Sequence, residues 1–252
     1  MSLSGKVCVV TGGGSGIGEA VALQLASEGA NVVTVGRTLQ KVENVSNQIK
    51  NNGGNSTPFS VDVSDAEKFN SMISNVLNDF GKIDILVNSA GGGVLHKRLL
   101  TTTPDDIRRC MGSNLEGTIY CTQAVLPSMI EQGEGLIVNI SSGAAKGSSF
   151  LGGMIYGVAK AGVNSFTDFI NFEFANTGVR ATVLMPGEVD TPALSNNRPI
   201  RPSQAALDTM LKAEDVADAV SMIANLPARA QVPEISIRPA HRRDTSSETP
   251  SS

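Results

Sequence analysis

The residues best suited to chemistry are Tyr156 and Lys160, which lie four positions apart in the stretch Tyr-Gly-Val-Ala-Lys. On a helix, residues at i and i+4 share one face, so the Lys160 ammonium is placed beside the Tyr156 ring. A free tyrosine has a pKa of about 10 and is a poor acid or base at neutral pH, but a neighbouring positive charge lowers that pKa. Because a tyrosine with a lowered pKa is a usable general acid or base, the pair predicts proton transfer in a carbonyl–alcohol interconversion.

Two serines and an asparagine precede this pair along the chain. Ser141 and Ser142 follow the apolar run 136–140, and Asn114 lies further upstream. Taken alone, a Tyr-x-x-x-Lys pair is more often a packed ring beside a solvated amine. The catalytic interpretation therefore depends on what the rest of the chain supplies.

A glycine-rich loop near the N-terminus predicts an anion-binding site. The apolar run Lys6–Val10 leads into Gly-x-x-x-Gly-x-Gly at 12–18, and the helical stretch Glu19–Ser27 follows. Glycine lets the backbone approach a ligand closely, and the first turn of a helix presents unpaired N–H groups. No Gly-Lys-Ser/Thr follows, which excludes a P-loop and favours a dinucleotide. The predicted contact residues in this loop are Gly12, Ser15, Gly16, Ile17 and Gly18.

Composition limits the class of protein. The 252 residues are 40% hydrophobic and 17% charged, with a net charge of −4, which is ordinary for a soluble globular enzyme. This mild acidity gives no support for nucleic acid or an anionic membrane as a partner. No run approaches the ~20 apolar residues of a membrane span, and no signal peptide is recognisable, so we expect a cytoplasmic protein.

The cysteine and histidine content argues against disulfides and metals. Cys8, Cys110 and Cys121 lack CxxC spacing and predict reduced thiols, as is usual in the cytosol. The chain has two histidines, His96 and His241, without an HExxH pattern. We therefore expect no metal site.

The elements that must position these residues alternate between short apolar runs and amphipathic stretches. This alternation, with a glycine loop after the first strand, predicts an α/β Rossmann fold: one domain with a seven-stranded, parallel, doubly wound sheet and helices on both faces. We expect the domain to span residues 1–239 and residues 240–252 to form a disordered polar tail. The predicted strands are Lys6–Val10, Asn31–Val35, Thr57–Val61, Ile83–Val87, Leu136–Ile140, Arg180–Leu184 and Glu234–Arg238.

Local signals mark several helix ends. The stretches Ser-Asp-Ala-Glu at 64–67 and Thr-Pro-Asp-Asp at 103–106 predict N-terminal caps. Gly29 and Gly81 follow helical runs, at positions where a left-handed residue commonly ends a helix.

With the glycine loop followed by the serine, tyrosine and lysine in this order, the sequence closely resembles the short-chain dehydrogenase/reductase family. The resemblance extends from about Gly5 to Pro239 and includes Asn-Ser-Ala-Gly at 88–91 and Pro-Gly-Glu-Val-Asp-Thr at 186–191. It implies an oxidoreductase that interconverts a carbonyl and an alcohol by hydride transfer with a nicotinamide dinucleotide. It also implies a homotetramer or homodimer built by packing the long helices that include Thr103–Leu126 and Tyr156–Ala175.

The resemblance implies a role for each site residue. Ser142 would hold the substrate oxygen, and Tyr156 would exchange a proton with it. Lys160 would lower the tyrosine pKa and bind the nicotinamide ribose, and Asn114 would hold a water that links Lys160 to a proton relay. The implied cofactor contacts, in addition to Tyr156 and Lys160, are Asp62 and Val63 at the adenine, Asn88, Ala90 and Gly91 at the adenosine ribose, and Pro186, Gly187, Val189 and Thr191 at the nicotinamide carboxamide.

Two departures from the family pattern bear on these roles. The usual Asn-Asn-Ala-Gly has Ser89 as its second residue here. The serine lies fourteen residues before Tyr156, where thirteen is common, so Ser141 and Ser142 both qualify. We predict Ser142, because the family's pattern ends its strand on the second serine and Ser141 would point the other way. Asn114 and Asn88 also have a plain structural interpretation, as bridges between backbone groups.

The residues after the second predicted strand indicate which cofactor binds. Enzymes selective for NAD usually place an acid there to bind the ribose 2′-hydroxyl, whereas this chain has Arg37 and Thr38. Arginine offers a planar pair of donors that suits a phosphate. The chain therefore predicts NADP(H), with NAD(H) as the alternative, because the other basic position of NADP-preferring relatives is Ser15 here.

The sequence leaves the substrate open. A segment at about 192–212 occupies the place of the family's substrate lid, and its Asn, Arg and Pro content favours an irregular loop. Glu188 either faces the pocket, where it would favour a polar or cationic small molecule, or is a solvated loop acid.

Other functions remain as alternatives to an NADP(H)-dependent reductase. A catalytically silent dinucleotide-binding regulator would be supported by loss of Ser142, Tyr156 or Lys160, but all three are present. An NAD-dependent alcohol dehydrogenase differs only in the cofactor. Epimerases and dehydratases on this fold usually carry an extended substrate domain, for which this chain has no room.

Overall fold

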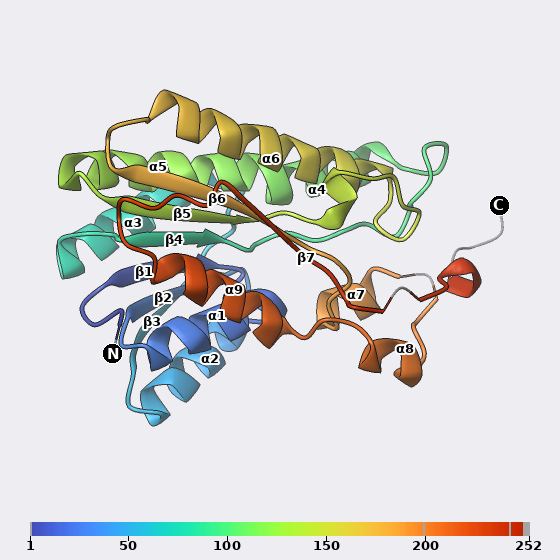
Figure 1. Ribbon diagram of the computed structural model, residues 1–252, viewed down its shortest axis with the longest axis horizontal. Helices are drawn as coiled ribbons and strands as arrows, with labels where there is room; N and C mark the ends of the chain where they lie inside the picture. The colour runs from blue at the N-terminus through green and yellow to red at the C-terminus, as the bar shows by residue number, and fades with distance from the viewer. Residues whose placement is uncertain (1, 199, 242, 249–252) are drawn as a thin grey trace.

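Short runs of β-branched residues form the central sheet, because such residues suit strands buried on both faces. The computed structural model describes residues 2–198, 200–241 and 243–248. Within them, parallel strands pair in the order β3-β2-β1-β4-β5-β6-β7 (Figure 1). The strands are β1 (Val7–Thr11), β2 (Asn31–Gly36), β3 (Asn55–Ser60), β4 (Ile85–Asn88), β5 (Gly135–Ile140), β6 (Val179–Pro186) and β7 (Glu234–Ile237). The predicted parallel α/β sheet of seven strands is confirmed.

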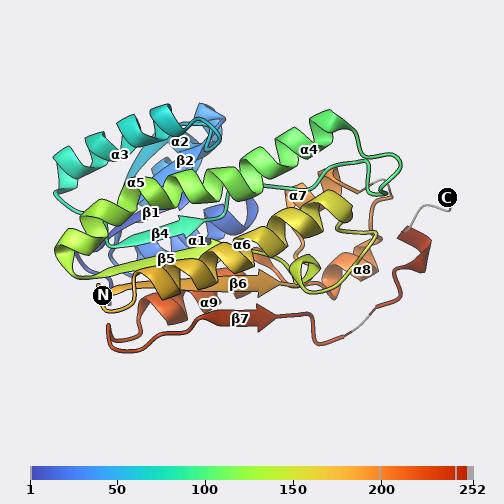
Figure 2. The same ribbon diagram turned by 90° about the horizontal axis from the view of Figure 1, so that it is seen from above.

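Helices cover both faces of this sheet (Figure 1), and the view from above shows α4, α5 and α6 lying across one of them (Figure 2). Helices α1, α2 and α9 pack against one face, and α3, α5 and α6 pack against the other. The alternation within β1 explains the two layers, because Val7 and Val9 face one core while Cys8 and Val10 face the other. The helices are α1 (Gly16–Ser27), α2 (Leu39–Asn51), α3 (Ala66–Phe80), α4 (Pro104–Met111), α5 (Gly117–Gln132), α6 (Met154–Glu173), α7 (Pro192–Asn196), α8 (Gln204–Asp208) and α9 (Ala213–Ala224). Among the described helices, none is long and apolar enough to cross a membrane.

The strand order reverses between β1 and β4, and this reversal fixes where a ligand can bind. Thr11 and Asn88, the last residues of these strands, are partners in the sheet register. The Thr11 hydroxyl accepts hydrogen bonds from the backbone N–H groups of Ser89 and Ala90, each at 3.1 Å. A crevice outside the carboxyl ends of the strands at such a switch point is the usual ligand site of an open α/β sheet.

The predicted start of α4 is confirmed. The Thr103 side chain accepts a hydrogen bond from the Asp106 N–H, and the Asp106 carboxylate accepts one from the Thr103 N–H, both at 3.1 Å. The predicted glycines are also confirmed in the left-handed region, with φ of 97° at Gly29 and 74° at Gly81.

The predicted cap at 64–67 is wrong by one residue. Asp65 caps α3, and its carboxylate accepts a hydrogen bond from the Lys68 N–H at 3.1 Å. Ser64 does not cap the helix because its hydroxyl donates to Asp62 Oδ1 at 2.8 Å. The Ser64 hydroxyl therefore binds the Asp62 carboxylate instead of the first turn of α3.

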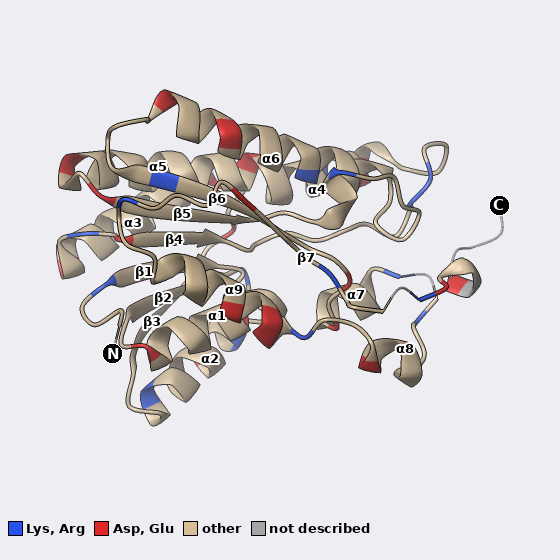
Figure 3. Cartoon of the chain, viewed as in Figure 1, with Lys and Arg blue, Asp and Glu red and all other residues tan. Residues whose placement is uncertain are grey.

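The segment expected to be a substrate lid contains α7 and α8, each one short turn capped by a hydroxyl residue. Residues 243–248, from the segment expected to be a disordered tail, contact this lid and the strand end beside it. Arg243 donates to Glu188 at 2.6 Å, and Glu248 pairs with Arg198 at 2.5 Å. Figure 3 shows basic and acidic positions close together where this C-terminal segment passes the lid. Pro199, in the lid, and residues 242 and 249–252 of the expected tail lie outside the described residues.

Candidate active site

The loops at the carboxyl ends of the strands surround a cavity of about 1200 Å³. Because parallel strands all end at the same edge of the sheet, the glycine loop, the segment after β4 and the residues after β5 and β6 meet there. Typical pockets for drug-sized ligands measure about 300–1,000 Å³. The volume of this cavity therefore exceeds that of a typical pocket for a single drug-sized ligand.

The glycine loop is packed too tightly for side chains at several of its positions, Gly12 and Gly18 among them. A Cβ on Gly12, where φ is 68°, would lie 2.9 Å from the Ser89 carbonyl oxygen, and a Cβ on Gly18 would lie 2.3 Å from the Gly12 carbonyl oxygen. Helix α1 begins at Gly16, and the Ser15 side chain does not cap it. The first N–H groups of α1 therefore remain available to an anion at the cavity.

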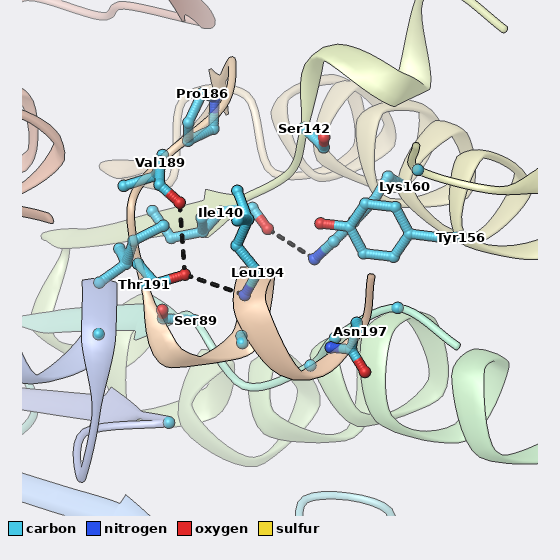
Figure 4. Close-up of a pocket in the computed structure, with 18 of the residues that line it drawn as sticks. Ser89, Ile140, Ser142, Tyr156, Lys160, Pro186, Val189, Thr191, Leu194 and Asn197 are labelled. Carbon is cyan, nitrogen blue, oxygen red and sulfur yellow. Dashed lines mark hydrogen bonds between the residues drawn. The ribbon is translucent and has the colours of Figure 1, made fainter. Parts of the chain in front are cut away.

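Tyr156 and Lys160 lie on the first turns of α6, and the end of β5 faces them. The Lys160 Nζ lies 5.7 Å from the centre of the Tyr156 ring and donates a hydrogen bond to the Ile140 carbonyl oxygen at 2.8 Å. Figure 4 shows the Tyr156 hydroxyl directed toward the same space as the Lys160 amine and the Ser142 hydroxyl. The i, i+4 arrangement expected from the sequence is present.

Burial dominates the acid–base properties of this pair. Burial raises the pKa of Tyr156 to about 12, although contact with the Ser142 hydroxyl acts in the opposite direction. Burial also lowers the pKa of Lys160 to about 8. Loss of hydration is the largest cause of the raised tyrosine pKa, and the lowering expected from Lys160 stays a prediction. At pH 7 Tyr156 is protonated, which is the form that can donate a proton.

The two serines after β5 face different partners. The Ser141 hydroxyl lies 2.6 Å from Asn164 Oδ1 and 3.1 Å from the Lys160 carbonyl oxygen, so α6 occupies it. The Ser142 hydroxyl accepts a hydrogen bond from the Ala144 N–H at 3.2 Å and lines the cavity beside Tyr156.

Asn114 lies in a π-helical turn, Gly112–Glu116, between α4 and α5. Its Nδ2 donates to the Gly92 carbonyl oxygen at 3.0 Å, and its Oδ1 accepts from the Gly92 N–H at 3.1 Å. A Cβ on Gly91, where φ is 143°, would lie 2.3 Å from Oδ1. The Asn114 side chain thus fixes the backbone that follows β4 from behind the cavity lining. π-turns of this kind are frequent at functional sites.

Most of the predicted cofactor contacts meet in the cavity. Those that line it are Gly12, Ser15, Gly16, Ile17, Arg37, Thr38, Asp62, Val63, Ala90, Gly91, Tyr156, Lys160, Pro186, Gly187, Val189 and Thr191. Gly18 and Asn88 lie behind this lining. The Asn88 amide donates to Asn139 Oδ1 at 2.9 Å and to Thr122 Oγ1 at 3.2 Å, so its side chain joins β4 to β5 and α5.

The lysines that line the cavity and that sequence reasoning missed include Lys41 and Lys97. Lys41, on the first turn of α2, packs against the glycine loop: a Cβ on Gly14 would lie 2.9 Å from the Lys41 Cβ. Its spacing of four from Arg37 was the signal that could have identified it. Lys97 has no comparable signal, because the loop after β4 is irregular. Among the described residues, neither lysine forms an ion pair with a carboxylate.

Glu188 lines the cavity, as the first of its two interpretations expected, but its carboxylate is paired with two arginines. Arg198 donates to its carboxylate at 2.5 Å, and Arg243 donates at 2.6 Å. Burial alone would raise the pKa of Glu188, but hydrogen bonds from Arg243 and Arg198 outweigh it and hold the pKa below its ordinary value. Glu188 is therefore a neutralised anchor between β6, the lid and the C-terminal segment.

The three cysteines are free and buried. Within the part of the chain that the structure describes, no group of three His, Cys, Asp or Glu side chains is arranged to hold a metal ion.

Comparison with known proteins places these features in context. The chain matches the family model described as short chain dehydrogenase over residues 6–202. An uncharacterized oxidoreductase of Staphylococcus aureus is 37% identical over 241 residues, which cover 94% of this chain and 98% of that protein. A metagenomic short-chain oxidoreductase in complex with NADP is 30% identical with a TM-score of 0.83, covering 96% of this chain and 100% of that one. An alcohol dehydrogenase from the archaeon Thermococcus sibiricus, complexed with 5-hydroxy-NADP, is 29% identical with a TM-score of 0.84, covering 95% and 98%.

Proposed function

Since this chain belongs to the short-chain dehydrogenase/reductase family of oxidoreductases, we propose that it interconverts a carbonyl and an alcohol with NADP(H), using Tyr156 as general acid and base. The observation that carries the proposal is the convergence of Ser142, Tyr156 and Lys160 on one end of the cavity, with the glycine loop lining the same cavity. A ketone or aldehyde held at the hydroxyls would lie within reach of both a proton donor and the cofactor.

The residues at the glycine-loop end fit a nicotinamide dinucleotide phosphate. The uncapped N-terminus of α1, which begins at Gly16, offers free backbone N–H groups to a pyrophosphate. Arg37 and Lys41 supply two cations at the end of β2, where no carboxylate would repel a 2′-phosphate. The two solved relatives with NADP and 5-hydroxy-NADP support NADP(H), and NAD(H) remains the alternative.

In the reducing direction, NADPH held at the glycine-loop end of the cavity would supply the hydride for the new C–H bond. The Ser142 hydroxyl donates a hydrogen bond to the carbonyl oxygen and holds it beside Tyr156. As negative charge develops on that oxygen, Tyr156 transfers its hydroxyl proton to it, and the product is an alcohol. The Lys160 ammonium stabilises the resulting phenolate. The Ile140 carbonyl oxygen orients this ammonium by accepting a hydrogen bond from it. Alcohol oxidation runs the same steps in reverse.

Two further proposals concern the protein's setting. Free buried thiols support a reducing compartment such as the cytoplasm. Phe169 and Phe172 on α6 are 54% and 79% exposed, and an exposed aromatic pair on a long helix supports assembly into a homodimer or homotetramer.

The direct test is incubation with NADPH and a panel of ketones and aldehydes, and with NADP⁺ and the corresponding alcohols. We expect loss of reduced-nicotinamide absorbance, with one alcohol formed for each NADPH consumed. Binding of NADPH without conversion of any carbonyl or alcohol in the panel would favour the catalytically silent regulator instead.

A further inference from the structure

Lys97 carries a buried amine that the proposed chemistry does not use. It lies in the segment between β4 and α4, and its carbonyl oxygen accepts a hydrogen bond from the Met154 N–H at 3.0 Å. Its stem packs on Gly153, where a Cβ would lie 2.8 Å from the Lys97 Cδ. Lys97 is thus attached to the start of the helix that carries Tyr156, and it is only 8% exposed.

The Lys97 amine lies at the substrate end of the cavity. The Lys97 Nζ is 3.5 Å from the Gly152 carbonyl oxygen, and a Cβ on Gly93 would lie 3.2 Å from the same Nζ. Gly152 in turn borders the tyrosine, because its Cβ position is 3.7 Å from Tyr156 Cδ1. On the other side, the Gly93 Cβ position is 3.8 Å from the Cβ of Asn197, the lid residue that faces the cavity in Figure 4.

The surroundings of this amine do not neutralise it. An ammonium has three donor hydrogens, yet the described residues give the Lys97 Nζ one acceptor, at the long distance of 3.5 Å, and no carboxylate. The nearby Arg198 is already neutralised by Glu188 and Glu248. Burial and, secondarily, the charge of Arg198 lower the pKa of Lys97 to about 8. A purely structural side chain would be more stable here without charge, because an unpaired buried amine is costly.

We propose that Lys97 binds a carboxylate of the substrate, so that the favoured substrates are oxo acids and the matching hydroxy acids. The inference rests on the proposed function, because it assigns the reducible carbonyl to Tyr156 and Ser142 and the anionic end of the same molecule to Lys97. A carboxylate is the group that one ammonium can neutralise, and the Asn197 side chain from the lid lies close enough to the same space to assist. By pairing with the substrate carboxylate, Lys97 determines the class of substrate and takes no part in proton transfer.

The experiment compares oxo acids with uncharged partners. Wild type, Lys97→Met and Lys97→Arg are assayed with NADPH on 2-, 3- and 4-oxo carboxylates, each paired with its methyl ester. In wild type we expect kcat/KM for at least one acid to exceed that for its ester at least tenfold. Lys97→Met should lower kcat/KM for that acid by about 10- to 100-fold, the factor typical of hydrogen bonds to charged groups, and change the ester less than about threefold. Lys97→Arg should retain part of the preference.

Three results would overturn the inference. One is an equal loss for acid and ester in Lys97→Met, which indicates a structural role. Another is an ester preferred over its acid in every wild-type pair. The third is a weaker affinity for NADPH in Lys97→Met with the acid preference unchanged, which would assign the amine to the cofactor.

Failure of the proposed function is a distinct outcome. If neither acids nor esters consume NADPH, the reductase proposal fails, and calorimetric titration of succinate into wild type and Lys97→Met decides the carboxylate site. Binding to wild type that is lost in Lys97→Met supports the site. No binding to wild type, or equal binding to both, refutes it.

Discussion

Replacing Lys97 with methionine should make the protein more stable at neutral pH. Methionine keeps an unbranched stem that can pack on Gly153, but it removes the amine that the fold buries without a counter-charge. Burial is the larger cause of the lowered pKa, followed by the charge of Arg198, while Cys110 acts in the opposite direction. A residue that costs stability yet remains at a cavity is the expected compromise at a functional site.

The size and the pH dependence of this effect follow from linkage. The pKa falls from 10.5 to about 8, and each pKa unit corresponds to about 1.4 kcal/mol, which gives an upper bound of about 3–4 kcal/mol. Because the amine borders a solvent-filled cavity, screening reduces the expected gain to about 1–2 kcal/mol. Between pH 8 and 10.5 the unfolded chain binds more protons than the folded one, so wild-type stability rises with pH in that window. The advantage of Lys97→Met should therefore be full at pH 7 and shrink toward pH 10.5.

The assay is urea unfolding followed by far-UV circular dichroism at pH 7, 8.5 and 10, at one protein concentration, because the chain has no tryptophan to report by fluorescence. Lys50→Met is the matched control, since Lys50 is exposed on α2 and its replacement should change stability by less than about 0.5 kcal/mol. A Lys97→Met protein that is less stable than wild type at pH 7, or a gap that does not change with pH, would refute the reasoning.

Three further predictions concern the cofactor, the backbone after β4 and assembly. Arg37→Ala and Lys41→Ala should each lower the ratio of kcat/KM for NADPH over NADH by about tenfold or more, because each removes a cation at the cavity lining; an unchanged ratio in both would contradict the assignment. Gly91→Ala should cost about 2 kcal/mol or more in urea unfolding, because φ is 143° and the new Cβ would lie 2.3 Å from an amide oxygen, whereas Gly53→Ala, also at positive φ but with open space around it, should cost less. Phe172→Glu should shift the light-scattering mass toward the monomer, because the 79% exposed ring is an expected interface contact; a wild-type protein that is already monomeric would contradict this.

The strands were predictable because their signal is local. Val7 to Val10 form an unbroken buried run followed directly by the glycine loop, and a short apolar run that ends in such a turn favours a buried parallel strand. Thr103 was also a correct cap, since its partner Asp106 lies three residues away. The cap at Ser64 failed for an equally local reason. The Asp62 carboxylate accepts the Ser64 hydroxyl while Asp65 caps the helix, and the sequence does not rank this arrangement against a cap at Ser64.

The electrostatics of the site were not predictable, because they depend on contacts between distant residues. The spacing of Tyr156 and Lys160 gives their shared face, but the direction of the ammonium is set by Ile140, twenty residues upstream. The neutralisation of Glu188 by Arg243 joins residues 55 positions apart. Burial, which raises the tyrosine pKa, is a property of the assembled cavity rather than of any spacing.

The measurement that tests the central claim most directly compares Tyr156→Phe with Tyr120→Phe, since these are the only two tyrosines in the chain. Tyr120 lies on α5 outside the cavity lining, so its replacement controls for loss of a hydroxyl elsewhere. With [4,4-²H₂]NADPH and the best carbonyl substrate, wild type and Tyr120→Phe should place deuterium on the carbinol carbon at similar rates. Tyr156→Phe should still bind NADPH yet form the deuterated alcohol about 10²- to 10⁴-fold more slowly. A Tyr156→Phe enzyme that turns over at the wild-type rate, or a wild-type product without deuterium at that carbon, would contradict the assignment of Tyr156 as the proton donor to a hydride-reduced carbonyl.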